Sequence, residues 1–214
     1  MRCVDDFHKY YEENRMWENT KWLGVPIWKL PFDAFIIQEL IYKVKPDYII
    51  ETGTGLGGSS IFYASILELM YHGVVLTIDT DHKKQQFSLC YNAGVVSRIS
   101  CIIGNSIDPD IVKEVSRFAN NKRCLVILDS WHSYDHVLEE MKLYSQFVAV
   151  GSYLIVEDSH VSGHPVKWEY GKGPFEAVKK FLKSNDDFVV DKECEKFIMT
   201  FNPNGYLKRI KKGD

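Results

Sequence analysis

Short runs of apolar residues alternate along this chain with longer stretches in which apolar residues recur at helical spacing. Five of these runs are rich in β-branched and aromatic residues and are too short for buried helices, so we interpret them as buried strands. They span residues 48–50, 74–78, 99–103, 124–128 and 148–156. Because a helical pattern separates each strand from the next, the runs predict parallel strands joined by crossover helices.

Two later runs, at 187–190 and 195–202, follow each other without a helix between them. Strands joined directly in this way predict an antiparallel pair at one edge of an otherwise parallel sheet. The expected fold is therefore α/β, with a Rossmann-like, doubly wound, mostly parallel seven-stranded sheet, an antiparallel edge strand and N-terminal helices.

Residues 1–45 precede the first strand and carry apolar residues at helical spacing. Between the helices predicted there, the segment TKWLGVPIWKLPFD at 20–33 is rich in Trp, Gly and Pro. Its Trp22 and Trp28 either form a lid over a pocket or pack the N-terminal helices onto the sheet. We expect a single domain, with an N-terminal helical cap and possible lid at 1–45 and a Rossmann-like core at 46–214.

The composition is typical of one domain, since 214 residues with 45% hydrophobic content can bury a sizeable core. The net charge of −3 gives no electrostatic case for nucleic acid, which requires a clustered basic face. We interpret the basic residues at 208–209 and 211–212 as a solvated tail. No stretch is long enough to span a membrane, and the N-terminus lacks an apolar signal segment. We therefore expect a cytoplasmic protein with neither nucleic-acid nor membrane partners.

The five cysteines are widely spaced and mostly lie among apolar residues. An odd number in this pattern is typical of reduced, buried thiols rather than of a disulfide framework. They are Cys3, Cys90, Cys101, Cys124 and Cys194.

A glycine-rich segment, ETGTGLGGSS at 51–60, lies between the first buried strand and a helical pattern. A strand, a glycine loop and a helix N-terminus form the arrangement in which a ligand can approach the backbone at the edge of an α/β sheet. Taken alone, the loop is also explained by tight turning, and the other strand ends therefore decide the interpretation.

Polar residues end the second and third strands as well. Asp79 ends the second strand, where α/β domains commonly bind the two hydroxyls of a ribose, and we favour this role over the alternative of a cap for a following helix. After the third strand, Gly104-Asn105-Ser106 is placed either to face an adenine ring or to cap the helix that begins near Pro109.

Three carboxylates follow the fourth and fifth strands, namely Asp129, Glu157 and Asp158. Crowded together, they repel one another unless a cation lies between them, and hard oxygen ligands suit Mg²⁺ or a similar divalent ion. The alternative is that these acids cap helices or pair with Lys and Arg. His132, three residues beyond Asp129, is a candidate general base, with a metal ligand that favours zinc and a surface residue as alternatives.

Together, the segments ETGTGLGGSS, TIDTDH, GNS, DSWH and SYLIVEDSH resemble the class I S-adenosylmethionine-dependent methyltransferases. More closely, they resemble the cephalosporin hydroxylase and rhamnosyl O-methyltransferase family, over most of the chain from KWLGVPIWKLPFD to GKGPFEAVKKFL. One departure is Trp131, which stands where that family often has an acid and changes the shape or polarity expected of the substrate pocket.

The resemblance implies a role for each candidate residue. Glu51, Gly53 and Gly55 would contact the methionine part of the cofactor, with Ser59 also in the cofactor site, Asp79 at the ribose and Ser106 at the adenine end. Asp129, Glu157 and Asp158 would hold Mg²⁺, and His132 would be the general base.

The implied reaction is methylation of a small-molecule hydroxyl. Mg²⁺ would lower the pKa of the acceptor hydroxyl, and His132 would remove its proton. The acceptor oxygen would then attack the sulfonium methyl group of the cofactor in line. A sugar diol, a catechol-like ring or a natural-product intermediate would fit as acceptor, and the aromatic N-terminal segment is a possible homo-oligomer interface. Two alternatives stay open: a nicotinamide-dependent oxidoreductase or hydroxylase, which would normally carry a different glycine spacing, and a non-catalytic binding protein with the cofactor fold.

Overall fold

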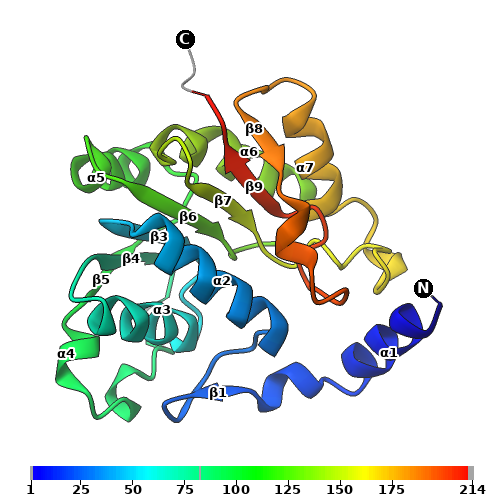
Figure 1. Ribbon diagram of the computed structural model, residues 1–214, viewed down its shortest axis with the longest axis horizontal. Coiled ribbons are helices and arrows are strands. Elements are labelled where there is room, and N and C mark those ends of the chain that lie inside the picture. Colours follow the sequence, from blue (N-terminus) through cyan, green and yellow to red (C-terminus); the bar gives the residue numbers. More distant parts are fainter. Residues whose placement is uncertain (1, 82, 212–214) are drawn as a thin grey trace.

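The structure, a computed structural model, describes residues 2–81 and 83–211, and these form a mostly parallel seven-stranded sheet in the order β5-β4-β3-β6-β7-β9-β8 (Figure 1). β5, β4, β3, β6 and β7 run parallel, and β9 lies antiparallel to both β7 and β8. The predicted fold class and its antiparallel pair at one edge are confirmed. The strands are β3 (Tyr48–Thr52), β4 (Val74–Asp79), β5 (Ile99–Ile103), β6 (Cys124–Leu128), β7 (Tyr153–Val156), β8 (Phe188–Val190) and β9 (Tyr206–Arg209).

The crossover helices lie between these strands as the apolar spacing predicts. The α-helices are α1 (Arg2–Glu13), α2 (Pro31–Val44), α3 (Gly58–Leu69), α4 (Ala93–Val96), α5 (Pro109–Ala119), α6 (Tyr134–Tyr144) and α7 (Pro174–Leu182). Short 3-10 helices are η1 (Met16–Asn19), η2 (Phe87–Leu89), η3 (Ser145–Phe147), η4 (Trp168–Tyr170) and η5 (Lys192–Glu195). Among the described residues, no helix has the length and apolar character that crossing a membrane requires.

The central strands are buried on both faces, because side chains alternate between two apolar clusters. On β6, Leu125 and Ile127 join the cluster under α2 and α3, whereas Val126 and Leu128 join the cluster under α5, α6 and α7. Figure 1 shows the two groups of helices on opposite sides of the sheet. This double covering explains why β6 is an uninterrupted apolar run rather than an alternating one.

Two predicted strands differ from the structure. The first, 148–156, is shorter, because Val148 makes only an isolated bridge with Cys124 and Gly151 has a φ of 83°, which extended backbone does not allow. Regular pairing begins at Tyr153.

The predicted strand 195–202 is wrong. Ile198 has a φ of 71°, and the following backbone is directed to the buried carboxylate of Asp33 on α2. That carboxylate accepts hydrogen bonds from the Thr200 hydroxyl and, at 2.8 Å, from the amide of Phe201. The last strand is instead β9, formed by residues that follow the apolar run.

Smaller differences concern the segments outside the strands. A hairpin of β1 (Lys21–Trp22) and β2 (Val25–Pro26) was not predicted. The basic residues are not a solvated tail, since Lys208 and Arg209 belong to β9 and Arg209 pairs with Asp187 at 3.1 Å, while Lys212 lies outside the described residues. All five cysteines are free thiols, as predicted, but Cys3 and Cys101 are exposed rather than buried.

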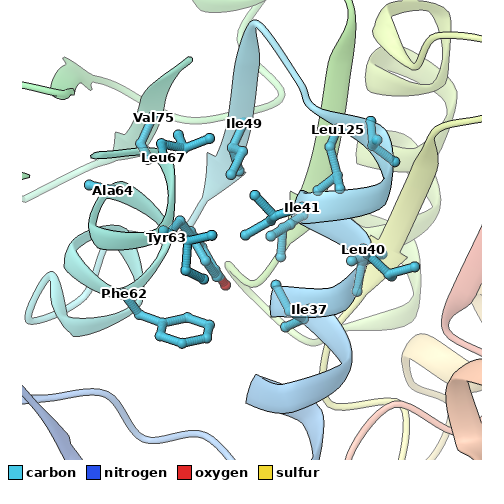
Figure 2. Close-up of a cluster of buried hydrophobic side chains, with 14 of the residues drawn as sticks. Ile37, Leu40, Ile41, Ile49, Phe62, Tyr63, Ala64, Leu67, Val75 and Leu125 are labelled. Carbon is cyan, nitrogen blue, oxygen red and sulfur yellow. The ribbon is translucent and has the colours of Figure 1, made fainter. Parts of the chain in front are cut away.

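The packing of α2 predicts a matched pair of stability effects. Ile41 on α2 is fully buried in the apolar cluster that α2 shares with α3 and β3 (Figure 2). The adjacent Tyr42 is 63% exposed. Ile41→Ala should lower the free energy of unfolding by about 2–5 kcal/mol, because it removes buried methylenes and leaves a cavity. Tyr42→Ala should change it by no more than about 0.5 kcal/mol. Urea unfolding followed by circular dichroism tests the pair, and equal losses would contradict this packing.

Candidate active site

One cleft of about 1010 Å³ lies at the carboxyl ends of the parallel strands, where the sequence predicts it. Seven of the predicted site residues line it, and three do not. The lining residues are Gly53, Gly55, Asp79, Ser106, Asp129, His132 and Asp158. The residues behind the lining are Glu51, Ser59 and Glu157, which are all buried.

The strand ends are fixed because the backbone ladder continues one residue past each strand. The amide of Gly53 donates to the carbonyl of Ile78 at 2.8 Å, and the amide of Asp129 donates to Thr52 at 2.9 Å. In the same way, the amide of Glu157 donates to Leu128 at 3.0 Å. The side chains that follow the strands therefore start from the rigid sheet rather than from mobile loops.

Gly53 and Gly55 of the loop favour glycine for different structural reasons. Gly53 has a φ of 87°, and a Cβ there would lie 1.9 Å from the carbonyl oxygen of Asp129. Gly55, with a φ of 52°, faces open space, where a Cβ would meet no atom within 4 Å. Gly53 thus permits β3 and β6 to approach each other, while Gly55 leaves room in the cleft.

Glu51 and Ser59 act inside the sheet rather than at the cleft surface. The carboxylate of Glu51 is fully buried and accepts hydrogen bonds from Ser59 at 2.5 Å, from Ser60 and from Thr77 at 2.7 Å. Burial raises the pKa of Glu51, and the three hydroxyls oppose that rise. This network ties β3, β4 and the first turn of α3 together, directly beneath the glycine loop.

Asp79 does not act as a helix cap. Its carboxylate accepts from the amide of Gly55 at 2.9 Å and from Asp81 at 3.1 Å, and the described residues just beyond it form turns. The helix-cap alternative is therefore wrong, and Asp79 fixes the glycine loop at the cleft.

Ser106 lies at the same end of the cleft and caps no helix either, because Asp108 is the N-cap of α5. Its hydroxyl and that of Ser130 donate to the buried carboxylate of Glu140, at 2.5 and 2.7 Å. His136 lies beside both hydroxyls and also lines the cleft. Sequence reasoning missed Glu140, because its position within α6 gives no signal beyond an ordinary helix residue.

Asp129, His132 and Asp158 converge, with one ligand atom from each lying within 4.8 Å of the others. His132 Nε2 is 3.4 Å from Asp129 Oδ1, and Nδ1 is 3.3 Å from Asp158 Oδ2. Burial disfavours the imidazolium, but Asp158 and Asp129 outweigh it and raise the pKa of His132 to about 9. The cluster therefore attracts positive charge, as the predicted carboxylate site requires.

Glu157 lies behind this cluster and faces Lys29, a residue that sequence reasoning did not single out. Lys29 Nζ lies 3.0 Å from Glu157 Oε1 and 3.0 Å from Asp129 Oδ2. Burial alone would lower the pKa of Lys29, but the two carboxylates raise it well above its ordinary value. Burial also raises the pKa of Glu157, to about 7, against the opposing effect of Lys29. The sequence signal for Lys29 is its position within the apolar segment GVPIWKLP, where a buried charge indicates a partner.

The other end of the cleft is built from the N-terminal segment and the loop after β7. Lys167 Nζ pairs with Glu12 on α1 at 2.7 Å, and Trp28 and Tyr170 contribute aromatic walls. Trp22 instead packs on α3, where its indole donates to Ser65 at 3.0 Å. Of the two interpretations of the tryptophans, packing therefore fits Trp22, and a position at the pocket fits Trp28.

Comparison with known proteins adds to this geometry. The family described as rhamnosyl O-methyltransferase/CmcI matches residues 14–210. The chain belongs to this family. Rhamnosyl O-methyltransferase of Mycobacterium tuberculosis (strain ATCC 25618 / H37Rv) is 37% identical over 211 residues, covering 96% of this chain and 84% of the relative. The enzyme of Mycobacterium leprae (strain TN) is 35% identical over 213 residues, covering 96% and 90%. The predicted family and the O-methyltransferase class are thereby confirmed.

Solved structures share the fold at low sequence identity. A CmcI structure named for Mg and SAM has a TM-score of 0.67 and 20% identity, covering 91% of this chain and 78% of that one. The O-methyltransferase TomG from Streptomyces achromogenes, in complex with SAM, has a TM-score of 0.61 and 16% identity, covering 99% and 91%.

The contrast between the two loop glycines is testable by substitution. Gly53→Ala should lower the free energy of unfolding by more than about 2 kcal/mol, because it adds an overlap with backbone to the cost of a left-handed alanine. Gly55→Ala should cost only about 1–2 kcal/mol, because the added methyl group meets open space. Chemical denaturation of both variants measures the difference, and a Gly53→Ala loss no larger than that of Gly55→Ala would contradict the close approach of β3 and β6.

A second prediction concerns acidification. His8 on α1 stacks on His160, with a ring distance of 5.0 Å, and burial together with His160 lowers its pKa from 6.5 to about 4. The folded chain then binds fewer protons than the unfolded chain, so stability should fall by up to about 3 kcal/mol as the pH decreases from 6.5 to 4. His8→Phe should flatten this part of the stability profile, and a profile as steep as that of the unaltered protein would contradict the prediction. Urea unfolding curves at several pH values between 6.5 and 4 measure the free energy of unfolding and test this prediction.

Proposed function

We propose that the chain transfers the methyl group of S-adenosylmethionine to a hydroxyl of a sugar-like small molecule, with Mg²⁺ at the acid cluster. The observation that carries this proposal is a single cleft that joins the glycine loop and Asp79 at one end to Asp129, His132 and Asp158 at the other. A methyl donor and an ionisable acceptor must meet in one enclosed space, because direct transfer requires alignment of the two reacting atoms.

The cofactor fits the first end of this cleft. The loop offers open space at Gly55 for a ligand. The names of the CmcI and TomG structures include SAM, the abbreviation of S-adenosylmethionine, which supports this cofactor. Gly53 and Gly55 would contact the methionine part of the cofactor. Asp79 would accept hydrogen bonds from the ribose hydroxyls, and Ser106 would lie beside the adenine. Glu51 and Ser59 support this site from within the sheet, because they hold α3 beneath the loop.

A divalent ion fits the second end. Asp129 and Asp158 offer hard oxygen donors, and His132 Nε2 is buried and finds no hydrogen-bond partner among residues 2–81 and 83–211. Mg²⁺, recorded for the CmcI structure, would supply Lewis acidity that lowers the pKa of a bound hydroxyl. Asp129 and Asp158 belong both to the predicted ligand set and to this cluster, whereas the third predicted ligand, Glu157, faces Lys29.

His132 has two candidate roles at this end. As a base it would take the proton of the acceptor hydroxyl; as a ligand it would share the ion with the acids. Both of its ring nitrogens face carboxylates, which favours the ligand role in this geometry. The general-base role stays a prediction.

The far end of the cleft supports a sugar as the acceptor. Trp28 and Tyr170 offer apolar faces, and Glu12 and Lys167 offer charged groups that can bind hydroxyls. The mycobacterial relatives are named for a rhamnosyl acceptor, and a sugar ring carries the neighbouring hydroxyls that a cation can bind together. On this reading, residues 1–45 act as a cap that supplies part of the acceptor site.

The deciding experiment is a calorimetric titration of the protein with S-adenosylmethionine and with NADH, each with and without Mg²⁺, followed by transfer assays on rhamnosides. Asp129→Asn should reduce Mg²⁺-dependent transfer by about 100-fold or more, because it removes a metal ligand, and it should change cofactor affinity by less than about threefold. Asp135→Asn, at an exposed position on α6, is the matched control. Preferential binding of NADH, or the absence of binding by both cofactors, would overturn the proposal in favour of an oxidoreductase or a non-catalytic protein.

A further inference from the structure

Lys29 is a buried cation at the acid cluster that no step of the proposed function uses. Its side chain is 4% exposed, and its ammonium lies 3.0 Å from a carboxylate oxygen of Asp129 and 3.0 Å from one of Glu157. A lysine is rarely buried so completely unless it is paired, and here the two pairing acids come from the ends of β6 and β7.

The backbone beside Lys29 is arranged to place it there. Trp28 has a φ of 54°, an uncommon conformation for a bulky residue, and it lines the cleft while Lys29 and Leu30 are buried. This turn sends adjacent side chains in opposite directions, with the indole at the acceptor end and the ammonium behind the acids.

Lys29 divides the acids into an inner and an outer set. Asp129 directs Oδ2 to Lys29 and Oδ1 toward His132, which is 3.4 Å away. Glu157 is 4% exposed on the inner side, whereas Asp158 lines the cleft. One ammonium thus contacts the buried carboxylate of Glu157 and one oxygen of the part-exposed Asp129, while Asp129 and Asp158 still line the cleft.

The charges of this group determine which cation it suits. With His132 neutral, as a metal-ligating histidine is, three carboxylates and one ammonium leave two negative charges, which a divalent ion balances. Without the ammonium, three negative charges would favour a trivalent ion. Buried charge is little screened, so a single nearby positive charge strongly affects cation affinity.

We infer that Lys29 is a positioning residue that holds Asp129 and Glu157 and sets the charge of the metal site for a divalent cation. This inference rests on the proposed function, because it concerns the same metal site. It assigns the segment before α2 a part in metal selection, in addition to its place at the acceptor end.

The test compares binding of Mn²⁺, followed by electron paramagnetic resonance, with binding of Tb³⁺, followed by its luminescence on tryptophan excitation. Lys29→Met should raise the preference for Tb³⁺ over Mn²⁺ by about tenfold or more, because it removes one positive charge beside the site. Lys29→Arg keeps the charge and should keep the preference of the unaltered protein.

A second pair of variants covers the case in which Lys29→Met does not fold. Glu157→Gln alone leaves one negative charge fewer and should shift the preference toward Mn²⁺. The double variant Lys29→Met/Glu157→Gln restores two negative charges and should return the preference to within about threefold of the starting value. A purely structural role for Lys29 would lower affinity for both ions together and would not produce this order.

The outcomes separate the two proposals. If the unaltered protein binds no Mn²⁺, the proposed metal-dependent function fails, and the charge-setting role fails with it. If the unaltered protein binds Mn²⁺ but the preference is the same in all folded variants, the role of Lys29 fails while the proposed function stands.

Discussion

Electrostatic repulsion among three carboxylates is the constraint that shapes this site. Asp129, Glu157 and Asp158 follow adjacent strands, so the parallel sheet necessarily brings them together. Such a cluster is stable only if the backbone is held rigidly and if positive charge lies close to it. The sheet supplies the first condition through the hydrogen bonds that continue past β6 and β7, and Lys29 and His132 supply the second.

The same sheet connects the cluster to the glycine loop. Gly53 lies so close to the carbonyl of Asp129 that a methyl group would not fit between them, and the amide of Gly55 binds the carboxylate of Asp79. The two ends of the cleft are therefore parts of one rigid unit rather than two loops that meet by chance. A rigid relation between donor and acceptor is what a direct methyl transfer requires, since the chemistry resides in the cofactor and the protein supplies alignment.

Most of the core and of the cleft could be predicted from the sequence, because they follow from strand ends. An apolar run identifies a strand, and the polar residue after it marks the edge where ligands bind, which is how Asp79, Asp129 and Asp158 were found. Where a local pattern competes with tertiary contacts, the prediction is wrong. The apolar run at 195–202 is typical of a strand, but Asp33, far away in the sequence, captures its backbone.

Lys29 and Glu140 could not be predicted for a related reason. Their roles depend on partners that are distant in the sequence. Lys29 pairs with Asp129, 100 residues away, and Glu140 accepts from Ser106, 34 residues away. No spacing rule relates such positions. A buried charge in an apolar segment signals that a partner exists, but the partner itself is identified only by the fold.

The cleft is divided between strand ends and other segments, and in the proposed function this division separates the cofactor from the acceptor. The proposed cofactor end lies at the ends of β3, β4 and β5, which belong to the fold that structural neighbours at 16–20% identity share. The proposed acceptor end is lined by residues of α1, by Trp28 and by the loop after β7, and the ion pair of Glu12 and Lys167 joins α1 to that loop. Loops and surface segments vary more readily than the sheet that carries them, so the acceptor end can change while the strand ends stay in place. Lys29 is the exception, since it extends from the acceptor segment into the acid cluster and couples the N-terminal segment to the charge balance of the core.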